Sequence, residues 1–297
     1  MGLIHQGLVA QQRPVQSLYM FEPMLVNPAY AGSAVQLSAT LINRSQWVNI
    51  PGAPTTQTLS VHSGFYKSRV GLGFILTRDV IGIHSDYGMY GVYSFNIPLP
   101  NKANLSMGLQ AGFNDLRSDF TLLNLQSQTD PNLAGVLKKF NPNFGAGLYY
   151  YTDNFYAGVS VPYLLENKLV NIEHVISEAK QSRNYYLMAG FQKKLSDNFK
   201  LSPNVLIRVQ DGAPLGIDLN TNLVYKQLML MGVSYRSGDA IIFLFELRLF
   251  DNLHLGYAYD YITSELNKFS NGSHEIMLNY RVKITRWHKG IECPSYF

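Results

Sequence analysis

The segment Leu105–Asn114 reads LSMGLQAGFN, and its character changes at every residue. Odd positions carry apolar side chains, and even positions carry small or polar ones. Successive side chains of a β-strand point to opposite faces, so this period of two indicates a strand between an apolar and a polar environment. The same alternation recurs along almost the whole chain. The sequence therefore predicts a protein built of two-faced strands.

Charged residues recur on the polar face of these strands. Glu246 and Arg248 interrupt Ala240–Phe250, and Asp260 lies within Leu253–Tyr261. Charges at regular intervals suit a closed sheet with lipid outside and water inside better than a dry core. The residues expected to face this lumen are Arg208, Asp218, Glu246, Arg248, Asp260 and Arg281.

Composition agrees with a membrane barrel. Charged residues make up 15% of the chain, against about 25% in an ordinary soluble domain. The 20 Tyr and 16 Phe are typical of the aromatic girdles of such barrels. No apolar run approaches the length of a membrane-spanning helix, which is about 18 residues. The small, scattered net charge of +4 does not indicate nucleic acid as a partner.

The pattern predicts about fourteen strands, most of them near the roughly 9–11 residues that a tilted strand needs to cross a bilayer. They are expected at Val35–Trp47, Thr56–Gly64, Arg69–Asp79, Ser85–Ile97, Ala103–Asp115, Asn143–Tyr151, Phe155–Val161, Tyr185–Leu195, Phe199–Arg208, Gly216–Tyr225, Leu228–Tyr235, Ala240–Phe250, Leu253–Tyr261 and Ser273–Val282. Fourteen strands enclose a lumen, between the filled eight-stranded barrels and the open sixteen-stranded porins.

Connections between the strands alternate in length. Short turns rich in Asp and Asn, such as Thr152–Asn154, are predicted at one end, because these residues suit tight turns. The other end carries longer loops, notably Phe120–Pro142, Pro162–Asn184 and Ile262–Gly272. This asymmetry is typical of outer-membrane barrels, whose short turns are periplasmic and whose long loops are extracellular. An even strand count then places both termini in the periplasm.

The chain is accordingly predicted to be all-β, with one antiparallel transmembrane barrel over residues 35–282 and a periplasmic tail over residues 283–297. Residues 1–34 are interpreted as a leader remnant followed by a lead-in segment that either plugs the lumen or packs against a partner. Lys168–Arg183 is expected to be either a helix or a disordered loop.

No catalytic pattern stands out. The chain lacks a Gly-x-Ser-x-Gly elbow, a phosphate loop and a His-Glu-x-x-His motif. Neighbouring strands carry His254, Asp260, His274 and Glu275, but charged lumen residues more often pair with one another than bind a metal. We expect no enzymatic activity, no cofactor and no metal site. Cys293 is expected to be a free thiol; the alternative is an intermolecular disulfide bond.

The most specific string is YMFEPMLVNPAYAGS at residues 19–33. It resembles the N-terminal signature of the PorP/SprF family, membrane proteins associated with the type IX secretion system of Bacteroidetes. Later segments are similar to further family motifs in the same order: RSQW at 44–47, GAPTTQ at 52–57, RNYYLMAG at 183–190, LSP at 201–203 and CPSYF at 293–297. Glu22 departs from the family by replacing a common amide, and Cys293 is unusual in the tail.

The resemblance implies a non-enzymatic outer-membrane component of the type IX secretion and gliding system, which supports export or surface anchoring of a large adhesin by binding its C-terminal domain. It also implies contact with periplasmic and outer-membrane parts of the machine. The long loops are the expected adhesin-binding surface, with Thr121 to Asn141, Glu166 to Arg183, and Thr263 to Asn271 as candidates. The alternatives are a porin-like diffusion channel for small solutes and a soluble β-sandwich binding module.

Overall fold

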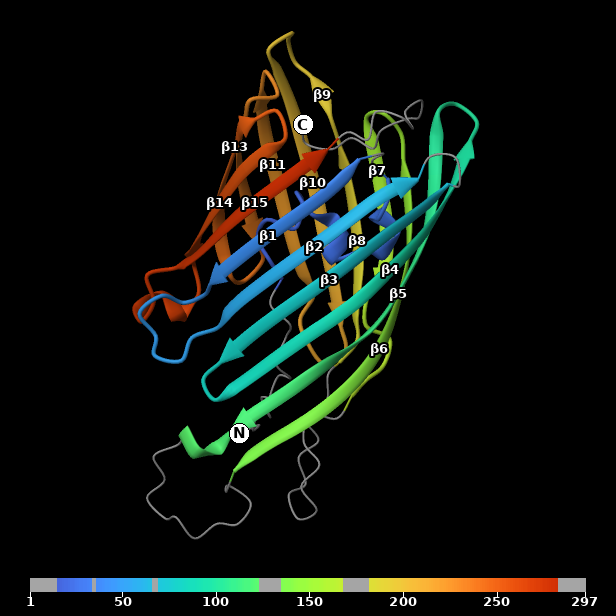
Figure 1. The fold of residues 1–297 in the computed structure, drawn as a ribbon. Coiled ribbons are helices and arrows are strands. Elements are labelled where there is room, and N and C mark those ends of the chain that lie inside the picture. The colour runs from blue at the N-terminus through green and yellow to red at the C-terminus, as the bar shows by residue number, and fades with distance from the viewer. Residues whose placement is uncertain (1–14, 34–35, 66–68, 123–134, 168–181, 283–297) are drawn as a thin grey trace, which may run out of the picture.

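A closed antiparallel barrel makes up the protein (Figure 1). The computed structural model describes residues 15–33, 36–65, 69–122, 135–167 and 182–282. Each long strand pairs with its neighbour in the chain, and β1 pairs with β15 to close the sheet. The two-residue β9 extends the β8 edge of the wall, so the barrel has fourteen full strands. The predicted fold class is confirmed.

The strands are β1 (Leu37–Ser45), β2 (Thr55–Phe65), β3 (Val70–Ile81), β4 (His84–Leu99), β5 (Ala103–Asp119), β6 (Val136–Tyr151), β7 (Phe155–Val161), β8 (Asn184–Phe191), β9 (Lys193–Lys194), β10 (Phe199–Gln210), β11 (Gly216–Tyr225), β12 (Met229–Arg236), β13 (Ala240–Phe250), β14 (Leu253–Ile262) and β15 (Ser273–Val282). Four of them have the predicted bounds, and most others differ by a few residues at their ends.

The largest error in the predicted strands concerns β6. It begins at Val136 and not at Asn143, because β5 continues to Asp119 and pairs with β6 along its whole length. The two lysines and the proline at 138, 139 and 142 made this stretch resemble a loop. They are accommodated because the β5–β6 hairpin extends beyond its neighbours at one end of the barrel (Figure 1).

We call the two rims the short-turn end and the long-loop end. At the short-turn end, Asn101, Lys102, Lys226 and Gln227 adopt positive φ, which lets two tight turns match the twist of the flanking strands. The long-loop end carries residues 46–54, 120–135, 162–183, 211–215 and 263–272, together with two tight turns at Gly82–Ile83 and Ser237–Asp239. The alternation in length is therefore real but incomplete. Most of the segment 168–183 lies outside the described residues.

The outer face of the wall is apolar. Large hydrophobic side chains such as Leu72, Leu109 and Phe144 point away from the lumen and are exposed, as expected of a surface that faces lipid chains. Within the described residues, no helix is long and apolar enough to span a bilayer.

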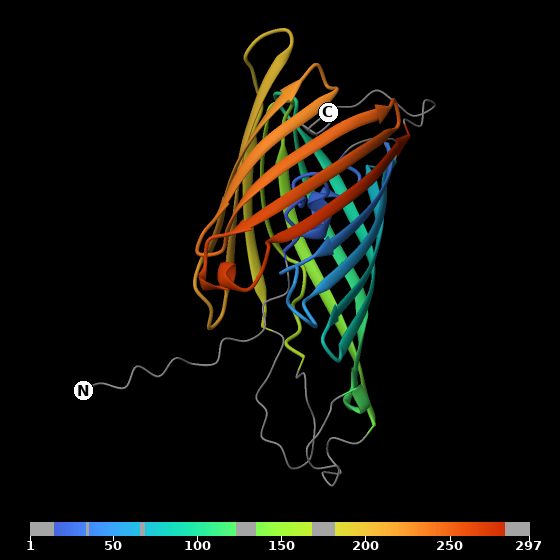
Figure 2. The ribbon, with the colours of Figure 1, turned by 90° about the vertical axis from the view of Figure 1, so that its left-hand side faces the viewer.

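A strap formed by residues 15–33 lies inside the barrel, where it is seen in dark blue in Figure 2. It contains two short 3₁₀ turns, η1 (Pro23–Leu25) and η2 (Pro28–Tyr30). Each turn begins with a proline, whose fixed φ suits that position. The Asn27 side chain accepts a hydrogen bond from the Ala29 N–H and caps η2. Nearly every strap residue is buried. The strap therefore lies in the lumen, which is one of the two positions that the sequence allowed for it.

Candidate functional site

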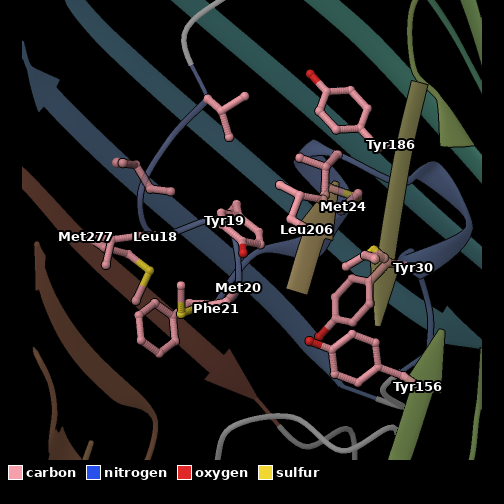
Figure 3. Close-up of a cluster of buried hydrophobic side chains, with 14 of the residues drawn as sticks. Leu18, Tyr19, Met20, Phe21, Met24, Tyr30, Tyr156, Tyr186, Leu206 and Met277 are labelled. Carbon is pink, nitrogen blue, oxygen red and sulfur yellow. The ribbon is translucent and has the colours of Figure 1, made fainter. Parts of the chain in front are cut away.

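The strap packs against the inner wall through apolar side chains. Figure 3 shows Met277, Leu206 and Tyr156 pointing inward from three different strands toward the strap. Within the strap, Leu18, Met24 and Ala29 have no solvent exposure. Burying side chains of the size of Leu18 and Met24 stabilises by roughly 1.5–3 kcal/mol each, so this contact alone favours a strap that stays in place.

Glycines on the inner wall make room for the strap. A Cβ atom at Gly108 would collide with the backbone of Ala29, and one at Gly71 would collide with the carbonyl of Ala31. These positions on β5 and β3 need glycine because another backbone approaches them closely. The Ser94 hydroxyl also donates a hydrogen bond to the Ala31 carbonyl. The wall is therefore shaped around this segment.

One carboxylate of the wall holds the beginning of the strap. Glu275, on β15, accepts hydrogen bonds from the backbone N–H of Ser17 at 2.8 Å and of Leu18 at 2.9 Å. The Ser17 hydroxyl donates to Asp260 at 2.9 Å and accepts from Arg44 at 2.8 Å. All five residues are buried. Hydrogen bonds to a charged group are about twice as strong as neutral ones, so these contacts form a latch near the long-loop end.

Six wall residues form what we call the inner charge cluster, namely Arg44, Arg208, Asp218, Arg236, Asp260 and Glu275. Arg44 pairs with Asp260 at 2.6 Å and with Glu275 at 2.8 Å, while Asp218 pairs with Arg208 at 3.0 Å and with Arg236 at 3.1 Å. Arg236 also lies 3.9 Å from Asp260, which links the two halves. With three arginines and three carboxylates the cluster is neutral, as a buried set of charges must be to avoid a large desolvation cost.

The middle of the strap makes a second set of polar contacts. Glu22 accepts a hydrogen bond from the Thr40 hydroxyl at 2.5 Å, and His62 lies 3.5 Å from its other carboxylate oxygen. Asn27 donates to the Leu148 carbonyl at 3.0 Å. The Ser160 hydroxyl donates to the Val26 carbonyl at 2.6 Å. The strap is thus tied to strands on opposite sides of the barrel.

The predicted lumen-facing residues fall on the inner side of their strands. Asp218, Glu246 and Asp260 are fully buried. Glu246 pairs with His254 at 3.0 Å and lies 3.9 Å from Arg281. Arg248 differs, because it lies at the short-turn rim and pairs with the exposed Asp251. The charges that we expected to line water mostly bind one another or the strap.

Sequence reasoning missed three members of this cluster as lumen residues, Arg44, Arg236 and Glu275. Arg44 lies within the RSQW motif, and Glu275 is one of four residues of neighbouring strands that could serve as metal ligands. The alternation of each strand could have identified them, because each of the three lies on the face of its strand that carries mostly small or polar residues. His274 points to the outer face, where its Nδ1 lies 2.7 Å from the Tyr257 hydroxyl. No cluster of metal-ligating side chains occurs in the described part of the chain.

The candidate partner-binding residues have mixed positions. The prediction that Asn141 belongs to an extracellular loop is wrong. Asn141 lies in β6 and is buried on the inner face, because that strand begins earlier than predicted. Thr121 is exposed in a short 3₁₀ turn. Glu166 and Arg183 approach to 3.9 Å where the β7–β8 loop leaves the barrel. The loop between Thr263 and Asn271 is fastened to its neighbours, since Thr263 donates to Asp239 and Asn271 to Val48.

A cavity of about 110 Å³ remains beside the strap toward the long-loop end. Val15, Tyr19 and Val26 of the strap form one side of it, and wall residues including Thr58 and Tyr186 form the other. This is small beside the roughly 300–1,000 Å³ of a typical ligand pocket. Because the cavity is small and the strap is buried, the exposed polar surfaces of the described barrel are its two rims.

The fold is shared with porin-like outer-membrane proteins. The Acinetobacter baumannii outer membrane protein Omp33 is 10% identical, with 84% of this chain and 98% of that chain covered and a TM-score of 0.47. The CymD monoaromatic hydrocarbon channel is 14% identical, with coverages of 90% and 92% and a TM-score of 0.50. The KdgM porin is 9% identical, with coverages of 82% and 98% and a TM-score of 0.42. These similarities concern the fold alone.

A search of curated protein sequences found no match. A family model, in contrast, matches nearly the whole chain. The matched residues include the strap, whose contacts with the wall are described above. The match spans residues 8–280, and the protein therefore belongs to the family of the type IX secretion system membrane protein PorP/SprF.

Proposed function

We propose that this protein is a non-enzymatic outer-membrane component that holds a secreted surface adhesin by its C-terminal domain at the long-loop end. Membership in the family makes it a membrane component of the type IX secretion system. The observation that carries the finer proposal is the strap, which lies buried inside the barrel and is latched to Glu275. A filled barrel offers its rims for recognition, and the long-loop end provides the larger of the two surfaces.

Three features support the long-loop end as a docking surface. The β5–β6 hairpin projects beyond the neighbouring strands (Figure 1). The β7–β8 loop leaves the wall at a fixed point, because Arg183 donates to the Leu164 carbonyl at 2.6 Å. The β14–β15 and β1–β2 loops are joined by backbone hydrogen bonds between Val48 and residues 271 and 272. These described parts of the rim are held in place, and preorganised segments lose little conformational entropy when they bind a folded domain.

The short-turn end is proposed to face the periplasm and other secretion components. There the β8–β10 hairpin and the adjacent β11–β12 turn carry Lys193, Lys194, Lys200 and Lys226. Asp197 pairs with Lys194 at 2.7 Å, which leaves an excess of positive charge. Such a surface suits an acidic partner. In this orientation, both ends of the described barrel chain lie toward the periplasm.

Loop replacement with co-purification tests the adhesin proposal. Residues 120–135, 164–183 and 263–272 are each replaced by a short Gly-Ser linker, and the adhesin C-terminal domain is used as bait. We expect binding to fall at least tenfold in one or more variants, while a matched replacement of the short turn 152–154 leaves it unchanged. Full binding by all three variants, with the barrels shown to be folded, would sink the proposal.

A diffusion channel requires the strap to leave the lumen. The buried contacts of Leu18, Met24 and Ala29 and the latch on Glu275 all oppose that movement. Planar-bilayer recording separates the two functions, because a channel gives stable conductance steps and an anchor with a filled lumen gives none.

A further inference from the structure

The outer wall changes from apolar to polar along one row of paired residues near the long-loop end. Leu41, Leu59, Leu76, Met89 and Phe113 lie opposite one another on β1 to β5. The next outward row toward the long loops is Asn43, Gln57, Arg78, Tyr87 and Asp115. On these five strands the outer face therefore changes from apolar to polar toward the long-loop end, as a barrel wall does where it passes from hydrocarbon to headgroups.

Two arginines flank one tyrosine at this boundary. The guanidinium of Arg78 lies 5.9 Å from the ring centre of Tyr87, and that of Arg117 lies 5.6 Å from it. Arg78 also donates to the Tyr87 hydroxyl and to Gln57, each at 3.3 Å. These contacts hold the two cations close together while using few of the five N–H donors of each guanidinium.

The charge around this tyrosine is positive overall. Asp115 accepts two hydrogen bonds from Arg117, at 2.8 and 2.7 Å. Lys138 stands directly opposite Arg117 on β6 and is exposed. Asp119 is the next outward residue of β5, so three cations and two carboxylates leave one positive charge. The remaining cation on the outer face of the described strands, Lys193, lies at the other end of the barrel.

An apolar groove begins directly beside these cations. It has a volume of about 510 Å³ and runs over Leu41, Leu59, Leu76, Met89 and Phe113, with Arg78, Tyr87 and Arg117 at one side. Gly88 lies beneath it and contributes no side chain. An acyl chain fits such a groove, and a phosphate fits the guanidinium groups at its end, which bind phosphate with two parallel hydrogen bonds.

We propose that this groove is a binding site for a phosphorylated, acylated lipid of the outer leaflet, namely lipid A. Arg78 and Arg117 bind a phosphate, Lys138 adds attraction, and the apolar row receives one acyl chain. Charge complementarity selects this occupant over a transmembrane segment of another protein, which would leave the two guanidinium groups without an anionic partner. The proposal does not depend on adhesin binding, although it does require the long-loop end to face outward.

Binding of purified barrel to lipid A in detergent tests the site. Bisphosphorylated lipid A, dephosphorylated lipid A and phosphatidylglycerol are compared by native mass spectrometry. The unmodified protein should prefer bisphosphorylated lipid A at least tenfold over the other two, and Arg78→Gln combined with Arg117→Gln should remove that preference. Lys193→Gln, an outward-facing change at the opposite rim, should preserve it. Equal binding of all three lipids, or an unchanged preference in the double variant, would overturn the proposal.

A crosslink in native membranes identifies the occupant directly. A photo-crosslinking residue in place of Met89 lies in the apolar row, and the same residue in place of Phe243 lies on the far wall. A phosphorylated lipid captured at position 89 and not at 243 supports the site. A protein captured at position 89, or equal lipid capture at the two positions, contradicts it.

Discussion

Glu275→Gln should release the beginning of the strap, and it also removes the ion pair between Glu275 and Arg44 in the wall. The carboxylate accepts the Ser17 and Leu18 N–H groups at 2.8 and 2.9 Å and is fully buried. A glutamine offers one acceptor oxygen, so one N–H loses a charged partner, at a cost of about 1.5–3 kcal/mol, and the other keeps a neutral bond that is about 1 kcal/mol weaker. The latch is therefore weakened by about 3 kcal/mol. Each 1.4 kcal/mol changes an equilibrium constant tenfold, so the population of the released state rises about 10²-fold.

Thiol labelling measures that population. Cys293, the one cysteine of the chain, is changed to serine, and Leu18→Cys places a probe in the buried beginning of the strap. Maleimide should label this thiol about a hundred times faster in the Glu275→Gln background. Glu246→Gln is the matched control, because Glu246 is equally buried but pairs with His254 of the wall. Equal labelling rates in the Glu275→Gln and Glu246→Gln backgrounds would refute the latch.

Further predictions concern the two faces of the wall. Gly108→Ala should destabilise the barrel by about 1–3 kcal/mol through overpacking against Ala29, whereas Gly91→Ala, where the nearest atom is 3.9 Å from the new Cβ, should change urea unfolding little. Equal midpoints of urea unfolding for the two variants would argue against close contact between Gly108 and Ala29. Leu109→Arg on the lipid face should cost about 2–4 kcal/mol and Phe250→Arg near the rim about 0–1 kcal/mol in liposome unfolding. A reversed order would show that the membrane boundary is misplaced.

The barrel could be predicted from the sequence because alternation is a local signal. A strand such as Leu105–Asn114 shows its two faces in ten consecutive residues, and Asp and Asn turns mark the ends of its neighbours. The start of β6 was missed for the same reason. Lys138, Lys139 and Pro142 carry loop-like local propensities, and the pairing with β5 that overrides them is not local.

The strap and its latch could be predicted only in part. Met20, Phe21 and Met24 are too apolar for an exposed tail, which indicated packing somewhere. Where they pack depends on contacts between residues more than 200 positions apart, such as Ser17 with Glu275. The charges of Asp218 and Asp260 suggested a wet lumen, but the same residue types also suit a buried, paired cluster. Sequence alternation identifies the inner face and does not say what occupies it.

Planar-bilayer conductance of the unmodified protein tests the central claim most directly. The claim is that residues 15–33 close the lumen and that function therefore lies at the rims. The account predicts no stable conductance steps from folded, inserted barrels, and porin-like steps when the strap is replaced by a Gly-Ser linker of equal length. Stable, large conductance from the unmodified protein would contradict the account.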